Sequence, residues 1–386
     1  MNESEHVRRS FGSRLFGGQP SRRAVLGAAG LGAAGVAIGS PAAAAAPAGA
    51  AAERRRVSMD DVPHAHTWMS WPASRSIWGR QLRGVQDDIA LIASAVAAYE
   101  PVIMCAVDDY AAADARAMCG RGVTVTSEIP TDDLWMRDIA PVFRRDASGR
   151  LDTIGLNFNG WGKKQTHGND ARVAGYAAEY ESLAFSRADF VGEGGSIETD
   201  GDGTVMATES SLVNKNRNRG RSRDEVEAAV LDAYGADKMI WVPGIKGKDI
   251  TDNHIDVTSR FVRPGVVMVQ IPPDDRTDIW ARDAREQLAI LAGSTDARGR
   301  RLQVIRVDGP DTVRSRDSKF VDSYLNFHVV NGAVITAQFG DRVKDEAARA
   351  ALAAAFPGRQ VVQLDVDRLM GGGGGIHCST MHQPLT

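Results

Sequence analysis

Short apolar runs typical of β-strands recur along the chain and are separated, two or three at a time, by segments whose apolar residues follow helical spacing. The predicted helices span residues 81–99, 171–183, 223–233, 278–291 and 341–356. The predicted strands span residues 102–107, 123–129, 139–143, 154–158, 205–208, 239–242, 255–261, 266–271, 302–307, 324–330, 333–337 and 360–364. Because no segment after residue 58 is rich enough in Pro, Gly or Ser to act as a linker, this pattern predicts one α/β domain of about five strand-strand-helix repeats.

Composition excludes several classes of partner. The chain has 386 residues, of which 43% are hydrophobic and 25% charged, and its net charge of -3 provides no field that would attract nucleic acid or an anionic membrane. No GxGxxG turn follows a strand and no GxxxxGK[ST] occurs, so a nucleotide-binding sheet has no support. Three cysteines are too few for a disulfide framework. If any disulfide forms, a bond between Cys105 and Cys119 would leave Cys378 as a free thiol.

Residues 1–57 are predicted to form a twin-arginine export signal followed by an Ala-rich and basic linker. Ser21-Arg22-Arg23 precedes a stretch without charges that ends at Ala52 and contains small-x-small cleavage sites. Its apolar part, residues 24–38, is shorter and weaker than the roughly 20 residues of a membrane span. We therefore expect export to the periplasm or the cell exterior, no membrane anchor after signal removal, and a catalytic domain over residues 58–386. A disordered Ala-rich tail is the alternative.

A candidate nucleophile follows a run of five glycines, residues 371–375, which ends in Ile376-His377-Cys378. Glycine lets another group approach the backbone closely. Flexible polyglycine tails are rich in serine and polar residues and do not end in such a triplet. We therefore interpret the segment as part of a functional site, with Cys378 as the nucleophile.

Two acidic residues lie in unusual surroundings. Asp138 stands between the aromatic Trp135 and a strand predicted to begin at residue 139; the simpler interpretation is a surface pair with Arg137. Glu193 has glycines on both sides, which would allow close approach to a ligand, whereas a hairpin turn with a solvated carboxylate is the alternative. Residues 214–223, dense in Asn and Arg, are predicted to be a solvated loop.

His254 and Asp256 are two residues apart, so they project to the same side if the segment is a strand. A zinc site made from these two residues with His377 and Cys378 is the rival interpretation. We rank it second, because neighbouring His377 and Cys378 would point to opposite sides of an extended strand and no His-x-x-x-His or Cys-x-x-Cys spacing occurs.

The combination of a thiol, an imidazole and two or three carboxylates restricts the chemistry. Carboxylates beside a nucleophile would oppose the oxyanion that forms when an amide or ester is attacked. A guanidinium instead needs acceptor-only groups for its N–H fork. The sequence therefore predicts a small cationic guanidine substrate.

These residues lie in motifs that together resemble the agmatine deiminase and bacterial peptidylarginine deiminase family of the guanidine-modifying superfamily. Between residues 59 and 384 the matching motifs are Thr67-Trp68-Met69-Ser70-Trp71-Pro72, Trp135-Met136-Arg137-Asp138, Glu193-Gly194-Gly195-Ser196-Ile197, Thr251-Asp252-Asn253-His254-Ile255-Asp256, Tyr324-Leu325-Asn326-Phe327 and the segment from Gly373 to Cys378. The resemblance implies a pseudo-fivefold α/β propeller of strand-strand-helix-strand units, with the active site on the central axis. Homo-oligomers are frequent in this superfamily.

The resemblance also implies a role for each site residue. Cys378 would attack the guanidinium carbon, Asp138 and Asp256 would hold its nitrogens, and His254 would protonate the departing ammonia and then activate water. The substrate pocket would be lined by Glu193, Trp135, Gly373, Gly374 and Gly375. Neither a metal nor an organic cofactor would take part.

The expected reaction is hydrolysis of agmatine to N-carbamoylputrescine and ammonia. Deimination of peptidyl or free arginine to citrulline is the alternative, and amidino transfer or non-catalytic binding of a metal or guanidinium is more remote. Agmatine deimination belongs to cytoplasmic polyamine (putrescine) biosynthesis, for which an export signal is unexpected. Asn253 replaces the Gly that the family usually has, and Asn tolerates the positive φ of that turn. Gly375, Ser379 and Met381 also depart from the usual residues, so agmatine specificity has less support than deimination.

Overall fold

The computed structural model describes residues 54–386, which all lie in one compact unit. The twin-arginine motif and most of the predicted linker lie outside the described residues. Arg56–Val57 forms a short strand, β1, that pairs with the strand β5, so the last residues before the predicted domain boundary take part in a sheet. Among residues 54–386, the structure contains no helix that is long and apolar enough to cross a membrane.

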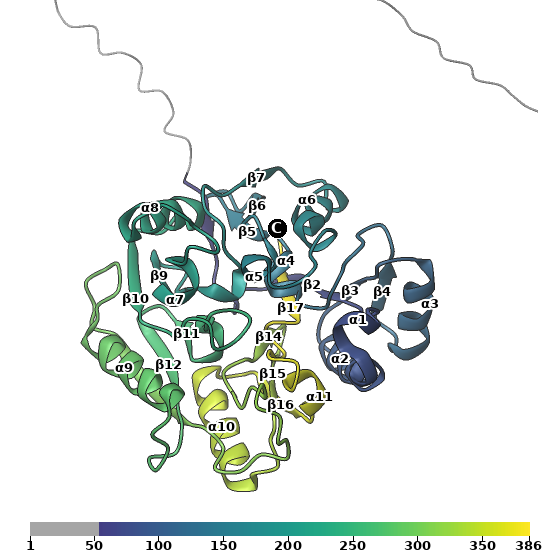
Figure 1. Cartoon of the computed structure of the whole chain (residues 1–386). Coiled ribbons are helices and arrows are strands. Elements are labelled where there is room, and N and C mark those ends of the chain that lie inside the picture. The colour runs from purple at the N-terminus through teal and green to yellow at the C-terminus, as the bar shows by residue number, and fades with distance from the viewer. Residues whose placement is uncertain (1–53) are drawn as a thin grey trace, which may run out of the picture. The chain divides into compact units, whose positions relative to one another are not determined.

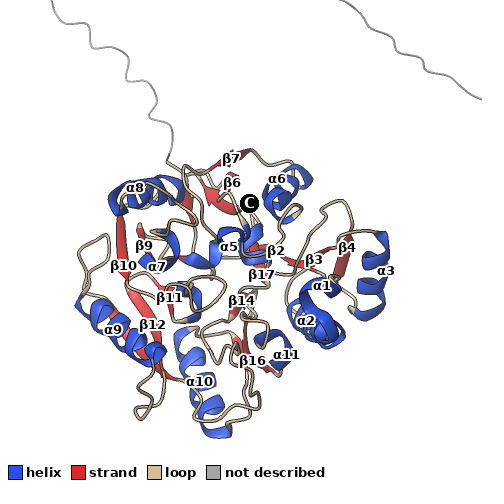
Figure 2. Ribbon diagram, in the orientation of Figure 1, coloured by secondary structure: helices blue, strands red, loops and turns tan. Residues whose placement is uncertain are grey.

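The strands form five sheets (Figures 1 and 2). The first contains β1 (Arg56–Val57), β5 (Val142–Arg145), β6 (Leu151–Gly155) and β7 (Phe185–Arg187). The second contains β8 (Ile197–Thr199), β9 (Thr204–Thr208) and β10 (Lys238–Val242). The third contains β11 (Ser259–Arg263), β12 (Val266–Ile271) and β13 (Gln303–Asp308). The fourth contains β14 (His328–Val330), β15 (Ala333–Ala337) and β16 (Gln360–Leu364). The fifth contains β17 (Thr380–Pro384), β2 (His64–Ser70), β3 (Val102–Cys105) and β4 (Val123–Thr126).

Every sheet repeats one connection. An antiparallel strand pair is followed by a parallel strand, as in β8–β9–β10 and β11–β12–β13. Parallel neighbours need a crossover, which a helix usually supplies. The crossover helices are α2 (Leu82–Ala97), α6 (Asp170–Tyr180), α8 (Arg223–Tyr234), α9 (Ile279–Gly293) and α10 (Arg342–Ala355). The α/β class is confirmed, and the five sheets remain separate rather than joining into one closed sheet.

Figure 1 shows the crossover helices towards the outside of the described unit, with short segments nearer its middle. The short helices are α1 (Arg75–Trp78), α4 (Met136–Ile139), α5 (Gly160–Lys163), α7 (Glu209–Leu212), α11 (Asp367–Met370) and the 3₁₀ turns η1 (Gly79–Gln81), η2 (Gly194–Ser196) and η3 (Ile255–Val257). A longer helix, α3 (Asp109–Met118), connects β3 to β4. Because β17 pairs with β2, the fifth sheet joins the two ends of the described chain.

Local sequence explains the helix boundaries. At α8, the Ser222 hydroxyl accepts from the Glu225 backbone N–H while the Glu225 carboxylate accepts from the Ser222 backbone N–H, and Gly235 ends the helix at φ 61°. In α2, Val85, Ile89 and other residues at helical spacing are fully buried. These elements follow from capping chemistry and apolar periodicity.

Several predicted elements are wrong. The strand expected from residue 139 starts at Val142, because Asp138 lies in α4. The strand expected over residues 255–261 begins with η3, and the one expected from residue 324 begins at His328. The strands β2 and β17 and the helix α3 were not predicted. Apolar residues in tight turns are buried just as strand residues are, so a single sequence does not separate the two.

The segment around Cys378 is also not an extended strand. Ser379 N–H donates to the Gly375 carbonyl and Thr380 N–H donates to the His377 carbonyl, which makes residues 375–380 a turn before β17. Cys105 and Cys119 are both free thiols.

Candidate active site

Cys378 is held by the side chain of Asn326. The Asn326 Nδ2 donates to Cys378 Sγ at 3.1 Å, and its Oδ1 accepts from the Cys378 backbone N–H at 3.2 Å. The Cys378 carbonyl accepts from the Arg137 backbone N–H. Asn326 belongs to one of the matching sequence motifs, but its role is not predictable from sequence, because a lone asparagine carries no spacing signal.

Asp138 is positioned by two donors from distant segments. Its Oδ1 accepts from the Gly195 backbone N–H at 3.1 Å and its Oδ2 from the Trp161 indole N–H at 2.9 Å. Trp161 lies at φ 53° between Gly160 and Gly162. The surface pair of Asp138 with Arg137 is wrong, since both side chains are buried. Trp161 is a site residue that was not predicted, although glycines flank it as they flank Glu193.

Asp256 lies in η3 and faces the thiol. Its Oδ2 accepts from His377 Nδ1 at 2.7 Å and from Asn326 Nδ2 at 3.3 Å, and the Cys378 thiol donates to it at 3.5 Å. Its Oδ1 has no hydrogen-bond partner among the described residues. A strand that would direct His254 and Asp256 to the same side is predicted here, but the structure has the 3₁₀ turn η3 instead.

The space beside Gly195 brings these groups together. A methyl group on Gly195 would lie 2.9 Å from Asp138 Oδ1, 2.9 Å from His254 Nδ1 and 3.1 Å from Asp256 Oδ2. Asp138 comes from α4, whereas His254 and Asp256 come from the start of η3, and all three side chains are buried. Their polar atoms converge on one small space that exists only because residue 195 has no side chain.

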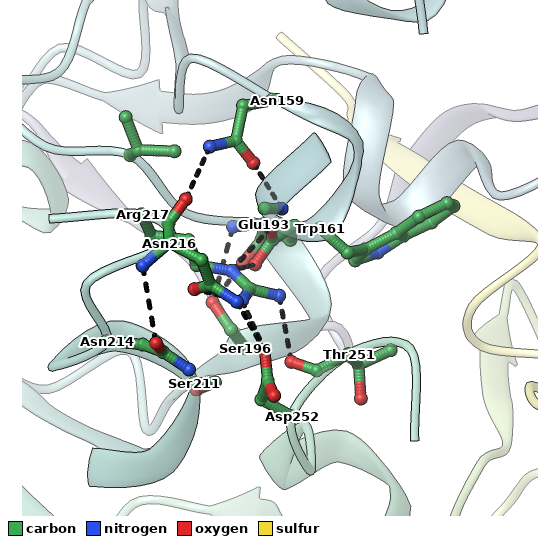
Figure 3. A network of polar contacts seen from close by, with 12 residues as sticks. Asn159, Trp161, Glu193, Ser196, Ser211, Asn214, Asn216, Arg217, Thr251 and Asp252 are labelled. Carbon is green, nitrogen blue, oxygen red and sulfur yellow. Dashed lines mark hydrogen bonds and ion pairs between the residues drawn. The ribbon is translucent and has the colours of Figure 1, made fainter. Parts of the chain in front are cut away.

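Glu193, Arg217 and Asp252 form a buried network of polar contacts (Figure 3). The Arg217 Nε–H contacts both Glu193 oxygens at 2.9 and 3.0 Å, and its Nη1 donates to Asp252 Oδ2 at 2.8 Å. The second Glu193 oxygen lies 3.2 Å from His254 Nε2. Glu193 is fully buried, so a solvated hairpin at Glu193 is wrong. The loop over residues 214–223 is exposed at Lys215, Arg219 and Arg223, as predicted, but Arg217 is only 6% exposed.

The turn before His254 has the conformation expected from its sequence. Asn253 has φ 71° and Asp252 has φ 63°, which confirms that Asn253 adopts the positive φ. The Thr208 hydroxyl donates to the Asn253 carbonyl, and Lys164 Nζ lies 2.8 Å from Asp252 Oδ2. This bracing places His254 against Glu193.

The electrostatics of the site favour a protonated imidazole beside a neutral thiol. Burial by itself would lower the pKa of His254, but the facing carboxylates of Asp138, Glu193 and Asp256 raise that pKa to about 9. Burial raises the pKa of Asp138 to about 6. Burial, with Asp256 and Asp138 nearby, raises the pKa of Cys378 well above its usual range.

The glycine run makes different contacts at each position. A methyl group on Gly374 would lie 2.5 Å from the Trp135 ring, so Gly374 and Trp135 pack against each other. A methyl group on Gly375 would lie 2.6 Å from Asn326 Oδ1, whereas Gly373, at φ 95°, has open space around it. Gly375 therefore leaves room for Asn326 rather than directly for a ligand.

The donor sets do not support the zinc alternative. Within residues 54–386, the group with ligand atoms close enough to share an ion is His64, Glu100 and His328, whose atoms lie within 4.8 Å of one another. Those side chains already hydrogen-bond one another or the Thr67 hydroxyl. His254, Asp256, His377 and Cys378 form no such group in this part of the chain.

Comparisons with known proteins identify relatives over nearly all of the described chain. Residues 56–384 match the family of Porphyromonas-type peptidyl-arginine deiminases. A Streptomyces coelicolor protein provisionally named agmatine deiminase is 38% identical over 86% of this chain and 99% of its own length. The agmatine deiminase of Pseudomonas aeruginosa strain UCBPP-PA14 is 36% identical over 85% of this chain and 95% of its own. The structure of Enterococcus faecalis agmatine deiminase, described as catalysing its reaction, superposes with a TM-score of 0.81 at 27% identity and covers 86% of this chain and 96% of that one.

Proposed function

Because the chain belongs to the family of Porphyromonas-type peptidyl-arginine deiminases, we propose that it hydrolyses the guanidinium group of agmatine to N-carbamoylputrescine and ammonia. This makes it a hydrolase of C–N bonds other than peptide bonds. The observation that carries the proposal is the convergence of two carboxylates and an imidazole on the space beside Gly195, within reach of Cys378. Acceptor-only oxygens there suit the N–H groups of a planar cation.

The reaction follows from these positions. A bound guanidinium favours the thiolate of Cys378, and the nearest acceptor for the thiol proton is Asp256 Oδ2 at 3.5 Å. Sulfur attacks the guanidinium carbon, and the C–N bond breaks as His254 donates its proton to the leaving ammonia. Neutral His254 then takes a proton from water, whose oxygen attacks the same carbon. The C–S bond breaks, the Cys378 sulfur recovers its proton from Asp256, and the ureido product leaves after losing its extra proton to ammonia.

The proposed arrangement of the fold is a pseudo-fivefold propeller with the site on its central axis. It is supported by five sheets with the same strand-strand-helix-strand connection and by β17 and β2, which join the two chain ends. Export by the twin-arginine route is likewise proposed, on the basis of residues 21–52. Mass spectrometry of the mature protein should find a new N-terminus after residue 40; an intact Met1 would contradict export with cleavage.

The decisive experiment is ammonia release from agmatine, free arginine and a blocked arginine peptide. We expect release from agmatine with the highest kcat/KM, and none above background from Cys378→Ala. The family's peptidyl-arginine deiminase name makes the blocked peptide the second candidate. Preferential turnover of the peptide would replace agmatine as substrate, and equal release by Cys378→Ala would overturn the covalent mechanism.

A further inference from the structure

A buried chain of polar groups continues from Asp256 away from the thiol. His377 Nδ1 lies 2.7 Å from Asp256 Oδ2, and His377 Nε2 lies 3.0 Å from Asp60 Oδ2. Asp60 precedes β2 and is 317 residues from His377 in sequence. The imidazole of His377 is 2% exposed, so its two nitrogens have these carboxylates as their neighbours instead of water.

The two contacts of the His377 ring determine how many protons the ring must carry. A neutral imidazole carries one N–H and one lone pair. With carboxylate oxygens at hydrogen-bond distance from both nitrogens, one contact would set a lone pair against an anionic oxygen. The chain Asp256–His377–Asp60 therefore needs one proton more than a neutral imidazole and two carboxylates supply.

The surrounding charges keep Asp60 ionised. Arg260 Nη2 lies 2.9 Å and Arg137 Nη2 3.5 Å from Asp60 Oδ2, while His382 Nδ1 lies 3.5 Å from Asp60 Oδ1. Although burial opposes ionisation, Arg137, His382 and His377 hold the pKa of Asp60 well below its usual range.

The same neighbourhood acts differently on His377. Burial and the guanidiniums of Arg137 and Arg260 lower the pKa of His377, and the hydrogen bonds to the two facing carboxylates oppose this shift only in part. The second proton is required by the two carboxylate contacts themselves, at 2.7 and 3.0 Å. Glu198, which pairs with Arg260 Nε at 2.6 Å, is the remaining acid of this cluster. A cavity of about 40 Å³ is lined in part by Asp60, Arg137, Glu198, Arg260, His377 and His382.

We propose that His377 is a positioning residue which, as an imidazolium donating to both Asp256 and Asp60, keeps Asp256 Oδ2 directed at Cys378 and places a positive charge beside the thiol. The kinetic part of this inference rests on the proposed function. Without the Nδ1 donor, Asp256 loses its shortest hydrogen bond, and the carboxylate that would hold the guanidinium becomes free to rotate.

Asp60→Asn separates charge from geometry. An asparagine amide can donate to His377 Nε2, so a neutral imidazole then satisfies both contacts. The positive charge next to Cys378 disappears, and we expect the pH at which iodoacetamide half-alkylates Cys378 to move upward. Mass spectrometry of the Cys378 peptide is required, because Cys105 and Cys119 are also free thiols. An alkylation profile that coincides with the wild type would overturn the proposal.

His377→Gln tests the positioning itself. We expect kcat/KM for agmatine to fall about 100-fold, as for a displaced binding group. The matched control is His66→Gln, which alters a buried histidine that lies near Glu181 and outside the Asp60 cluster; its kcat/KM and alkylation profile should equal those of the wild type. The double variant Asp60→Asn/His377→Gln should be no worse than His377→Gln alone, because both act through one chain. Additive losses would indicate two independent structural effects and contradict the proposal.

The two sets of readouts are independent. Alkylation needs no substrate, so a shifted profile in a protein that releases no ammonia from any guanidine would refute the proposed function and retain the imidazolium. Ammonia release from agmatine together with unshifted alkylation profiles would retain the proposed function and refute the imidazolium.

Discussion

Two neighbouring regions of the molecule differ in the cationic groups that contact their buried carboxylates. Around Arg217, the acids Glu193 and Asp252 have a guanidinium between them (Figure 3). Lys164 pairs with Asp252 as a second cation. In the space beside Gly195, no arginine or lysine contacts Asp138 or Asp256 among the described residues, and Asp256 Oδ1 has no partner there.

This difference concerns the kind of cation that the acids face. Arg217 carries a permanent charge. The acids beside Gly195 instead face the imidazoles of His254 and His377, whose charge depends on pH. Glu193 belongs to both regions, because it contacts Arg217 and His254. The region around Arg217 therefore supports the geometry of the region beside Gly195, and variants in each should affect different properties.

Arg217→Met should produce the largest change, in stability. It leaves Glu193 and Asp252 buried without their cation, and we expect the free energy of unfolding to fall by about 3–5 kcal/mol. Urea denaturation measures it. Arg223→Met is the control, because its pair with Glu209 is about half exposed and should contribute less than about 1 kcal/mol. Equal losses in both variants would show that burial of the Arg217 pair is unimportant.

Gly195→Ala should instead affect activity. Its methyl group would occupy the space between Asp138, His254 and Asp256, so we expect kcat/KM for agmatine to fall about 100-fold or more. Gly168→Ala, where no atom lies within 4 Å of the added methyl group, should keep wild-type kinetics. An active Gly195→Ala enzyme would place the guanidinium elsewhere.

The pH dependence of kcat/KM should follow the two groups with raised pKa values. Asp138, with a pKa of about 6, must be ionised to hold the cation, so activity should fall about tenfold per pH unit below pH 6. His254, with a pKa of about 9, must be protonated to release ammonia, so activity should fall similarly above pH 9. Steady-state assays from pH 5 to 10 check both limbs. Activity that still rises between pH 9 and 10 would contradict the acid role of His254.

Glu193→Gln should give the smallest change, a displacement of the alkaline limb. Removing a carboxylate that favours the imidazolium lowers the pKa of His254, so the alkaline limb should move to lower pH. The acid limb should also move to lower pH, because the Glu193 charge raises the pKa of Asp138. Asp249→Asn, in the same loop as His254 but hydrogen-bonded to Thr251 instead of the imidazole, is a suitable control. An unchanged alkaline limb in Glu193→Gln would show that Glu193 does not set the pKa of His254.

Much of the architecture could be predicted from local pattern. The capping box at Ser222 and Glu225 and the apolar face of α2 fix helices within their own sequence, so the crossover helices were found. The strands that were predicted to begin too early coincide with buried turns. Asp138 lies in α4 and Asp256 in η3 because their backbones bend to direct side chains inward, and apolar neighbours in such turns imitate strands.

The sequence predicts which reactive residues belong to the candidate site, but it does not predict which side chains contact and orient them. Cys378, His254, Asp138, Asp256 and Glu193 were selected from glycine flanks and motif resemblance, and the structure brings them together around Gly195. Their orienting partners Asn326, Trp161 and Arg217 were missed, because each acts through one side chain that no spacing rule connects to the site.

The sequence by itself determined the kinds of chemistry available: a nucleophilic thiol after a glycine run, an imidazole, acids suited to a guanidinium, and alternating segments of an α/β fold. Only the tertiary structure decided which acids face an arginine, which face a histidine and which protons are shared. Those properties depend on distances between residues far apart in the chain, such as the 3.0 Å between His377 and Asp60 across 317 positions. Burial then decides their effect, because charges shielded from water determine one another's pKa values.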